Sequence, residues 1–186
     1  MKNQLFNEIS NNISSCNKCS LYKTRTLPVP GEGSINARIF FIGEGPGKQE
    51  DLTGRPFVGA AGKFLDELLT GIDLKREDVF IGNIVKCRPP NNRVPLPLEV
   101  DACKPYLIAQ IALVQPEVIC TLGNTPLKTL ISSELSIGKI HGTVIKKDGF
   151  TFMPMYHPAA VLYHGALKGT LKEDFDKLKD FLKNRE

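Results

Sequence analysis

RIFFIGEGPG, residues 38–47, is an apolar run that ends in a loop of glycine, glutamate and proline. The run is short and rich in β-branched and aromatic residues, which is typical of a buried strand. Three other runs have the same character: VFIGNIV at 79–85, VICTLG at 118–123 and FTFMPM at 150–155. We therefore expect four buried strands, with loops at their ends.

Segments with helical spacing lie between and after these runs. They cover residues 60–70, 97–114 and 124–131, and a last amphipathic stretch covers about 168–182. Asn124, which precedes Thr-Pro, is predicted to cap the third helix. Strands that alternate with helices predict an α/β fold, with a mostly parallel sheet covered on both faces. Such sheets bind ligands at the carboxyl ends of their strands, so we expect the chemistry in the loops there.

Length and composition indicate an ordinary globular protein. The 186 residues suit one hydrophobic core, so a single domain over residues 1–186 is expected. No apolar run approaches the roughly 18 residues of a membrane span, and the polar N-terminus does not resemble a secretory signal. We therefore predict a cytoplasmic protein, monomeric and without membrane contact. The net charge of +4 permits binding to a polyanion but does not by itself predict it.

Four of the five cysteines suggest one site. Cys16 and Cys19 form a Cys-x2-Cys pair in a polar loop, and Cys87 and Cys103 have polar or proline neighbours. Two distant cysteines can complete a site begun by such a pair, and the spacing leaves zinc and a [4Fe-4S] cluster both open. Unrelated free thiols are the third interpretation. Cys120 lies inside an apolar run, where a core role is expected.

Three polar residues stand at the predicted strand ends. Glu44 lies in the glycine loop 43–47, whose spacing is G-x-G-x-G with Lys48 where a dinucleotide fingerprint would have its third glycine. A carboxylate there favours catalysis over cofactor binding. Asn83 ends an apolar run, where a buried amide needs partners, although capping a loop would also explain it. His157 begins a loop-to-helix transition at the same edge, and a lone histidine is more often structural than catalytic.

The order and spacing of six features resemble the family 4 (type-4) uracil-DNA glycosylases over nearly the whole chain. The features are Cys16-x2-Cys19, GEGPG at 43–47, GRPFVGAAGKFLD at 54–66, NIVKCRPPNNR at 83–93, Cys103 and HPAA at 157–160. The resemblance implies the uracil-DNA glycosylase fold, with a central four-stranded parallel sheet flanked by helices. It also implies that Cys16, Cys19, Cys87 and Cys103 hold a structural [4Fe-4S] cluster, which decides between iron and zinc.

The same resemblance implies a base-excision repair enzyme that hydrolyses the N-glycosidic bond of deoxyuridine and leaves an abasic site. Glu44 and His157 would be catalytic, because their loops would face each other across the uracil pocket and converge on the glycosidic bond. Binding roles would fall to five residues: Gly43 and Gly45 through the backbone, Glu50 against a thymine methyl group, Phe57 by stacking, and Asn83 on the base edge. Gly45 departs from the family, where alanine is usual at this position.

A base inside a duplex must be flipped out before it can be cut, so DNA contacts are expected around the pocket. Val161, Leu162 and Tyr163 are candidates to fill the gap, with helix packing as the alternative. Arg88, Arg93 and Lys168 are candidates to bind phosphates. The expected partner is uracil-containing DNA, single- or double-stranded, and a sliding clamp is a further candidate.

Three alternatives compete with a glycosylase. A relative that becomes covalently trapped on DNA differs in having glutamine after the first glutamate of the glycine loop and a basic, histidine-bearing insertion, neither of which occurs here. A non-catalytic iron-sulfur or zinc module would bind nucleic acid with Glu44 and His157 incidental. A small redox protein would use the cysteines alone. Only the glycosylase releases free uracil.

Overall fold

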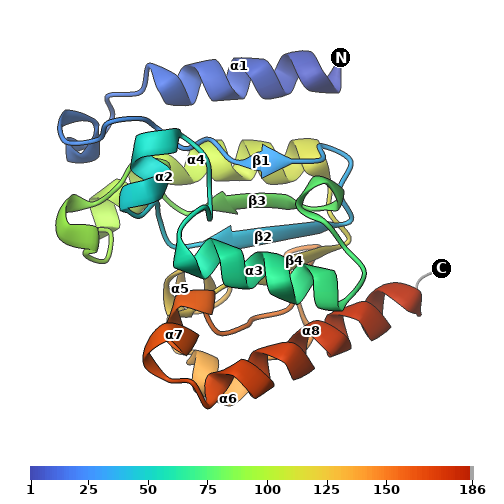
Figure 1. Cartoon of the computed structure of the whole chain (residues 1–186). Coiled ribbons are helices and arrows are strands. Elements are labelled where there is room, and N and C mark those ends of the chain that lie inside the picture. Colours follow the sequence, from blue (N-terminus) through green and yellow to red (C-terminus); the bar gives the residue numbers. More distant parts are fainter. Residues whose placement is uncertain (185–186) are drawn as a thin grey trace.

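The sheet is built around β2 (Ile39–Gly43), the apolar run that precedes the glycine loop. A computed structural model describes residues 1–184 of the chain. In it, β3 (Phe80–Asn83) and β4 (Val118–Thr121) pair with β2 in parallel on either side, and β6 (Phe150–Phe152) pairs in parallel with β4 (Figure 1). The prediction of an α/β fold with a four-stranded parallel centre is confirmed.

Two short edge strands, which were not predicted, extend the four-stranded parallel centre. The sheet has six strands in the order β1-β3-β2-β4-β6-β5, because β1 (Glu32–Gly33) and β5 (Ile145–Lys147) add antiparallel edges. These strands are only two and three residues long and contain glutamate, glycine and lysine. No apolar run therefore marks them in the sequence.

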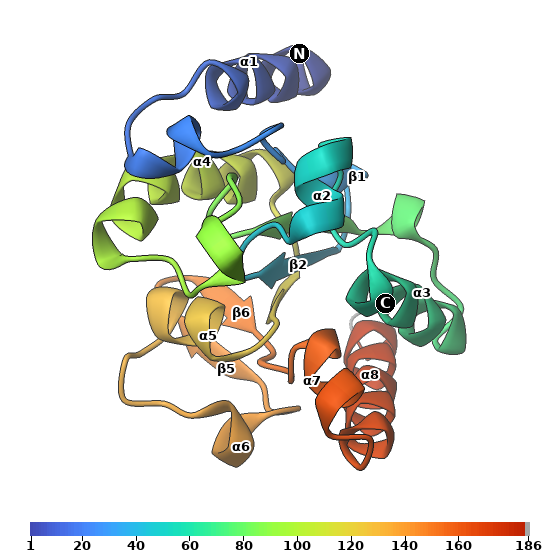
Figure 2. The ribbon, with the colours of Figure 1, turned by 60° about the vertical axis from the view of Figure 1, so that its left-hand side comes forward.

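Helices cover both faces of this sheet, as predicted. Figure 2 separates the two layers, with α3 and α8 on one side and α4 and α5 on the other. The helices are α1 (Lys2–Ser14), α2 (Lys48–Thr53), α3 (Ala60–Gly71), α4 (Pro97–Val114), α5 (Asn124–Leu130), α6 (Ile137–Ile140), α7 (Pro158–Tyr163) and α8 (Leu167–Lys183), with short 3₁₀ turns η1 (Ser20–Lys23), η2 (Arg76–Asp78) and η3 (Pro90–Asn92).

Alternate residues of β2 enter the two layers of the core. Ile39 and Phe41 pack among α3 and α8, and the Phe41 ring stacks on Phe175 with centroids 5.5 Å apart. Phe40 and Ile42 pack on the opposite face, with α4 and α5. Because all four side chains are buried, the strand reads as one continuous apolar run rather than an alternating pattern.

The predicted helix boundaries agree with the structure to within about one residue. The predicted cap of α5 was wrong: Gly123, at φ +90°, is the N-cap, and Asn124 is the first helical residue. The Asn124 side chain instead accepts a hydrogen bond from the Ile137 amide at 3.0 Å, which ties α5 to α6.

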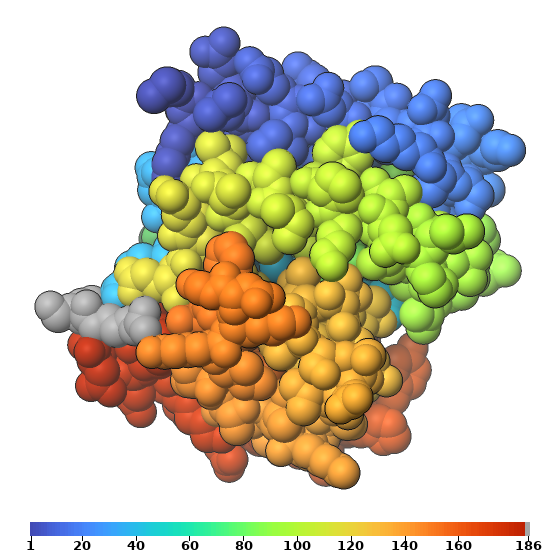
Figure 3. Space-filling view, turned by 180° about the vertical axis from the view of Figure 1, so that it is seen from behind, coloured from blue at the N-terminus to red at the C-terminus, as the bar shows by residue number. Residues whose placement is uncertain are grey.

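The N-terminal segment lies against α4, as the view from behind shows (Figure 3). This contact brings the first two cysteines towards the segment that carries the other two. Among residues 1–184, none of the helices combines the length and the apolar character that crossing a bilayer requires.

Candidate active site and cysteine site

An open pocket of about 560 Å³ lies at the carboxyl ends of the parallel strands. The arrowheads of β2 and β3 point to this edge in Figure 1. The loops after β2, β3 and β4 and the start of α7 all contribute to its lining. Of the predicted site residues, the pocket is lined by Glu44, Gly45, Glu50, Phe57, Asn83, Arg93, His157 and Tyr163. Residues far apart in the sequence are thus brought together, as expected.

Gly43 has no side chain, which leaves room for two side chains that line this pocket, those of Asn83 and Phe57. A Cβ atom at position 43 would lie 2.5 Å from Asn83 Oδ1 and 2.7 Å from Cζ of Phe57, which no real side chain tolerates. The Oδ1 atom of Asn83 is buried and accepts no hydrogen bond from any group in the described part of the chain. An acceptor buried without a partner is costly, so this atom is suited to a ligand that brings a donor.

Glu50 uses its carboxylate to join two loops. Oε1 accepts hydrogen bonds from the backbone amides of Val58 and Gly59, each at 2.9 Å, and Oε2 accepts one from the Gly47 amide at 3.1 Å. The glycine loop and the segment that carries Phe57 are therefore fixed to each other.

His157 is half-buried at the start of α7, and its protonation state follows from its contacts. Its Nδ1 accepts a hydrogen bond from the Ala159 amide at 3.1 Å, so in the neutral ring the proton is on Nε2. Burial lowers the pKa of His157 to about 4, although the nearby Glu50 carboxylate opposes the shift. The ring stacks against Phe57 with centroids 5.5 Å apart. The site therefore contains a neutral imidazole that can donate a hydrogen bond through Nε2.

Glu44 is oriented by a residue that the sequence analysis missed. The Thr125 hydroxyl, at the start of α5, donates a hydrogen bond of 2.5 Å to Glu44 Oε2. In the sequence, the loop after β4 was considered only for helix capping. Thr125 could have been found as a hydroxyl residue in the first turn of the predicted helix, at the same sheet edge as the glycine loop.

Of the predicted DNA contacts, Arg93 and Tyr163 line the pocket. Leu162 and Tyr163 are 55% and 83% exposed, whereas Val161 is partly buried and packs against the core. Arg88 donates to Asn92, and Lys168 lies over the Phe64 ring.

Arg93 lines the pocket and forms a bidentate ion pair with Glu99. The Glu99 carboxylate also accepts hydrogen bonds from the Leu96 amide and the Ser20 hydroxyl. The Arg93 pair is the largest influence that lowers the pKa of Glu99, to about 2. The loop between β3 and α4 is thereby fixed to the N-terminal segment.

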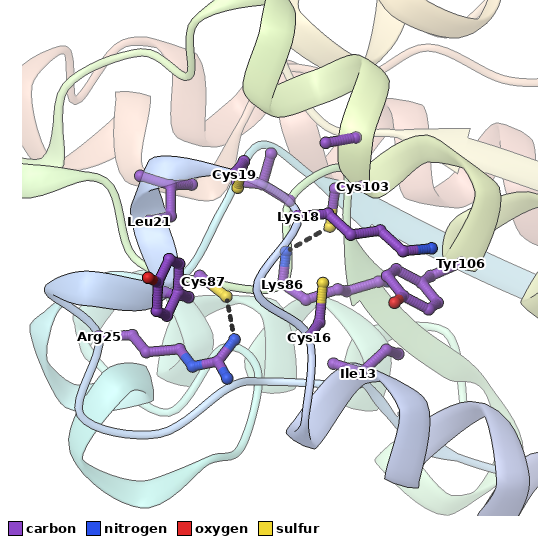
Figure 4. A pocket seen from close by; sticks show the side chains of 13 residues that line it. Ile13, Cys16, Lys18, Cys19, Leu21, Arg25, Lys86, Cys87, Cys103 and Tyr106 are labelled. Atoms are coloured by element: carbon purple, nitrogen blue, oxygen red, sulfur yellow. Dashed lines mark hydrogen bonds between the residues drawn. The ribbon is translucent and has the colours of Figure 1, made fainter.

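Cys16, Cys19, Cys87 and Cys103 line a second pocket, shown in Figure 4. Their side chains surround a common space. Cys16 and Cys19 come from the N-terminal loop, Cys87 comes from the loop after β3, and Cys103 comes from α4. The free thiols are half-buried in the first pair and buried in the second. Within residues 1–184, no three His, Cys, Asp or Glu side chains gather closely enough to hold one metal ion.

Two N–H groups point at the sulfurs of this cysteine site. Arg25 Nη1 donates to the Cys87 Sγ at 3.1 Å, and the Lys86 amide donates to the Cys103 Sγ at 3.2 Å. Burial raises the pKa of Cys87, and it raises the pKa of Cys103 to about 11, so both are thiols at neutral pH unless a positive centre binds. Cys120 lies apart from them in the core, fully buried, as predicted.

Comparisons with known proteins show the family of the chain. Residues 30–183 match the sequence model of the uracil DNA glycosylase superfamily. The chain is 46% identical to a type-4 uracil-DNA glycosylase of Saccharolobus solfataricus, covering 95% of this chain and 86% of that one. It is 44% identical to the type-4 enzyme of Thermotoga maritima, covering 98% and 97%. The chain belongs to the uracil-DNA glycosylase superfamily, within its type-4 branch.

Proposed function

We propose that this protein hydrolyses the N-glycosidic bond of deoxyuridine in DNA, releasing uracil and leaving an abasic site for repair. The observation that carries the proposal is the convergence of Glu44, Asn83 and His157 on one pocket in a chain of this family. The four cysteines that a small redox protein would use lie in a separate pocket, so they do not account for the polar residues that converge on this one.

Asn83 is suited to distinguish uracil from cytosine. Its buried Oδ1 can accept a hydrogen bond from the N3–H of uracil, while its amide can donate to O4. Cytosine presents an acceptor at N3 and a donor at N4, so both contacts would be lost. Gly45 would offer its backbone amide to a base carbonyl, Phe57 would stack on the base, and Glu50 would stand against a thymine methyl group.

His157 and Glu44 would act on the opposite charges that develop as the bond breaks. The departing uracil becomes anionic, and a neutral Nε2–H donor at one of its oxygens stabilises that charge. The sugar acquires oxocarbenium character, which a nearby carboxylate stabilises. Glu44, oriented by Thr125, would fill that role and direct a water molecule to the sugar. The Thr125 hydroxyl is therefore a positioning group for the carboxylate.

The DNA would be held around the mouth of the pocket. Leu162 and Tyr163 are exposed beside it and can occupy the space left by the flipped nucleotide, with Val161 supporting them from the core. Arg88, Arg93 and Lys168 would bind phosphates, so affinity should weaken as salt rises. We propose that the protein acts as a monomer of a single domain over residues 1–186, in the cytoplasm, on single- or double-stranded DNA, with a sliding clamp as a candidate partner.

We also propose that Cys16, Cys19, Cys87 and Cys103 hold a structural [4Fe-4S] cluster. Four thiols that share one pocket are a complete set of ligands for such a cluster, and the resemblance to the type-4 enzymes favours iron over zinc. Donors from Arg25 and the Lys86 amide suit thiolate acceptors. When bound, the cluster would supply a cross-link between the N-terminal loop and the segment 87–103.

The test is release of free uracil from a labelled oligonucleotide with one deoxyuridine, beside matched thymine and cytosine oligonucleotides. We expect release from the uracil substrate alone, with an alkali-labile site left in the strand. Tight binding to the uracil oligonucleotide without release would favour the non-catalytic binding module instead.

The protonation state of His157 predicts a pH dependence of stability. Its pKa is lower in the folded state than in the unfolded state, so between about pH 4 and the usual pKa near 6.5 the unfolded chain binds more protons. The stability that the neutral ring contributes is thus present above pH 6.5 and lost as pH falls towards 4. We expect the free energy of unfolding to fall more steeply over this range in the parent than in His157→Ala.

A histidine NMR titration checks the same point. The chain has three histidines, and the His157 resonance is identified by its loss in the alanine variant. A His157 signal that titrates near pH 6.5 would contradict the neutral-donor mechanism.

A further inference from the structure

Phe57 has a backbone conformation that an aromatic residue rarely adopts. Its φ is +52°, in the left-handed region. Such conformations persist only where the surroundings hold them, and they gather at functional sites. The ring that this backbone carries lies over Gly43 and against His157. Its place in the pocket therefore depends on the backbone conformation of Phe57. Whatever holds this backbone therefore also holds the face proposed to stack on uracil.

Arg76 holds the carbonyl side of this segment. It lies in η2, 19 residues further along the chain, and donates from Nη2 to the Pro56 carbonyl at 2.5 Å and from Nη1 to the Phe57 carbonyl at 2.9 Å. The guanidinium is itself fixed by Glu32, at 2.6 Å from Nη2, and by Asp66, at 2.9 Å from Nη1. A planar group with several donors in fixed directions can make these contacts at once.

Glu50 holds the amide side of the same segment. Its Oε1 accepts from the amides of Val58 and Gly59, the two residues that follow Phe57. Helix α3 approaches from a third direction, since a Cβ at Gly62 would lie 1.8 Å from the Phe57 carbonyl oxygen. Arg76 thus binds the carbonyls of the peptide groups before and after Phe57, and Glu50 binds the N–H of the second of these groups.

We infer that Arg76 is a positioning residue for base binding, which acts with Glu50 by holding Phe57 in its left-handed conformation at the pocket. The inference rests on the proposed function. Arg76 need not touch the substrate, because its two carbonyl contacts are to Phe57, which is proposed to do so, and to Pro56 directly before it. Without them, the segment 56–59 can relax and the ring leaves its place over Gly43.

The experiment compares Arg76→Ala and Arg76→Lys with a matched control, Arg55→Ala. Arg55 also pairs with Glu32, but its side chain is 61% exposed and its hydrogen bonds go to Glu32, not to the carbonyls of Pro56 and Phe57. A displaced binding group commonly costs one to two orders of magnitude in rate. We expect Arg76→Ala to lower kcat/KM for uracil release by at least about tenfold and Arg76→Lys to restore part of it. Arg55→Ala should change kcat/KM by less than about threefold.

A cycle with Phe57→Ala separates positioning from general loss of structure. If Arg76 acts through the ring, Arg76→Ala should cost less than about threefold in the Phe57→Ala background. Amide hydrogen exchange at Val58 and Gly59 should be faster in Arg76→Ala than in Arg55→Ala, at temperatures where both remain folded. Equal losses of activity in both backgrounds, or unchanged exchange at these amides, would overturn the inference.

The two proposals fail differently. A parent protein that releases no uracil would refute the proposed function, while hydrogen exchange would still report whether Arg76 holds this segment. A parent that releases uracil at the same rate as Arg76→Ala would leave the function intact and refute the role of Arg76.

Discussion

Replacing His157 with alanine is expected to lower kcat for uracil release at least about 100-fold, the usual cost of removing one preorganised contact to a developing anion. The contact is made chiefly as the bond breaks, so KM should change much less than kcat. Glu44→Ala should cause a loss of similar size, since it removes the carboxylate proposed to stabilise the cationic sugar. Single-turnover release from a labelled oligonucleotide measures both effects without interference from product release.

His164 provides the matched control for His157. It is exposed at the end of α7, after the same short helix that His157 begins. We expect His164→Ala to retain kcat within about threefold. Parent-like turnover in His157→Ala would remove the imidazole from the mechanism, and an equal loss in His164→Ala would point to damage to α7 instead.

If Cys87 is a ligand of the proposed cluster, replacing it with serine should abolish the brown colour and the bound iron that such a cluster gives a protein, and should destabilise the fold. Loss of a structural metal centre belongs to the few changes that cost more than about 4 kcal/mol. For a chain of this size, that corresponds to a fall of roughly 8–16 °C in Tm. The fall follows because Cys87 belongs to the segment that the cluster would join to the N-terminal loop. Iron analysis, visible absorption and thermal unfolding measure the three effects.

Cys120→Ala is the control for a cysteine change in itself. Cys120 is buried on β4 in the core, so its loss leaves a small cavity but should leave colour and iron content unchanged. Retention of iron by Cys87→Ser would refute the assignment of Cys87 as a ligand. A colourless parent that contains zinc would instead support the zinc interpretation of the same cysteines.

The sequence predicted the parallel centre of the sheet because these strands are covered on both faces. Phe40 packs on one face and Phe41 on the other, so each strand is a continuous apolar run. It also predicted helices α3 and α4 well, since each carries a long apolar pattern between strands. β1 and β5 could not be predicted, because strands of two and three residues bury little apolar surface and are too short to show an alternating pattern of apolar and polar residues.

The site was predicted as a set of residues but not as a set of contacts. Glu44, Asn83 and His157 stood at strand ends, so the topology alone was enough to bring them together. The partners of these residues depend on side-chain geometry across the fold. Arg76 and Thr125 are unremarkable in sequence, and the proton on Nε2 of His157 is determined by an amide two residues away.

The two edge strands have a consequence for how copies of the protein meet. A sheet edge offers unpaired backbone groups to which another chain can add, and short, charged edges reduce that risk. Here one edge has only Glu32 and Gly33, and the other carries Lys146 and Lys147 beside Ile145. The catalytic sheet is thus poorly suited to recruit strands from a neighbour. The short, charged edge strands therefore reduce aggregation through strand pairing. Many copies bound close together on one damaged DNA need not pair through their sheet edges.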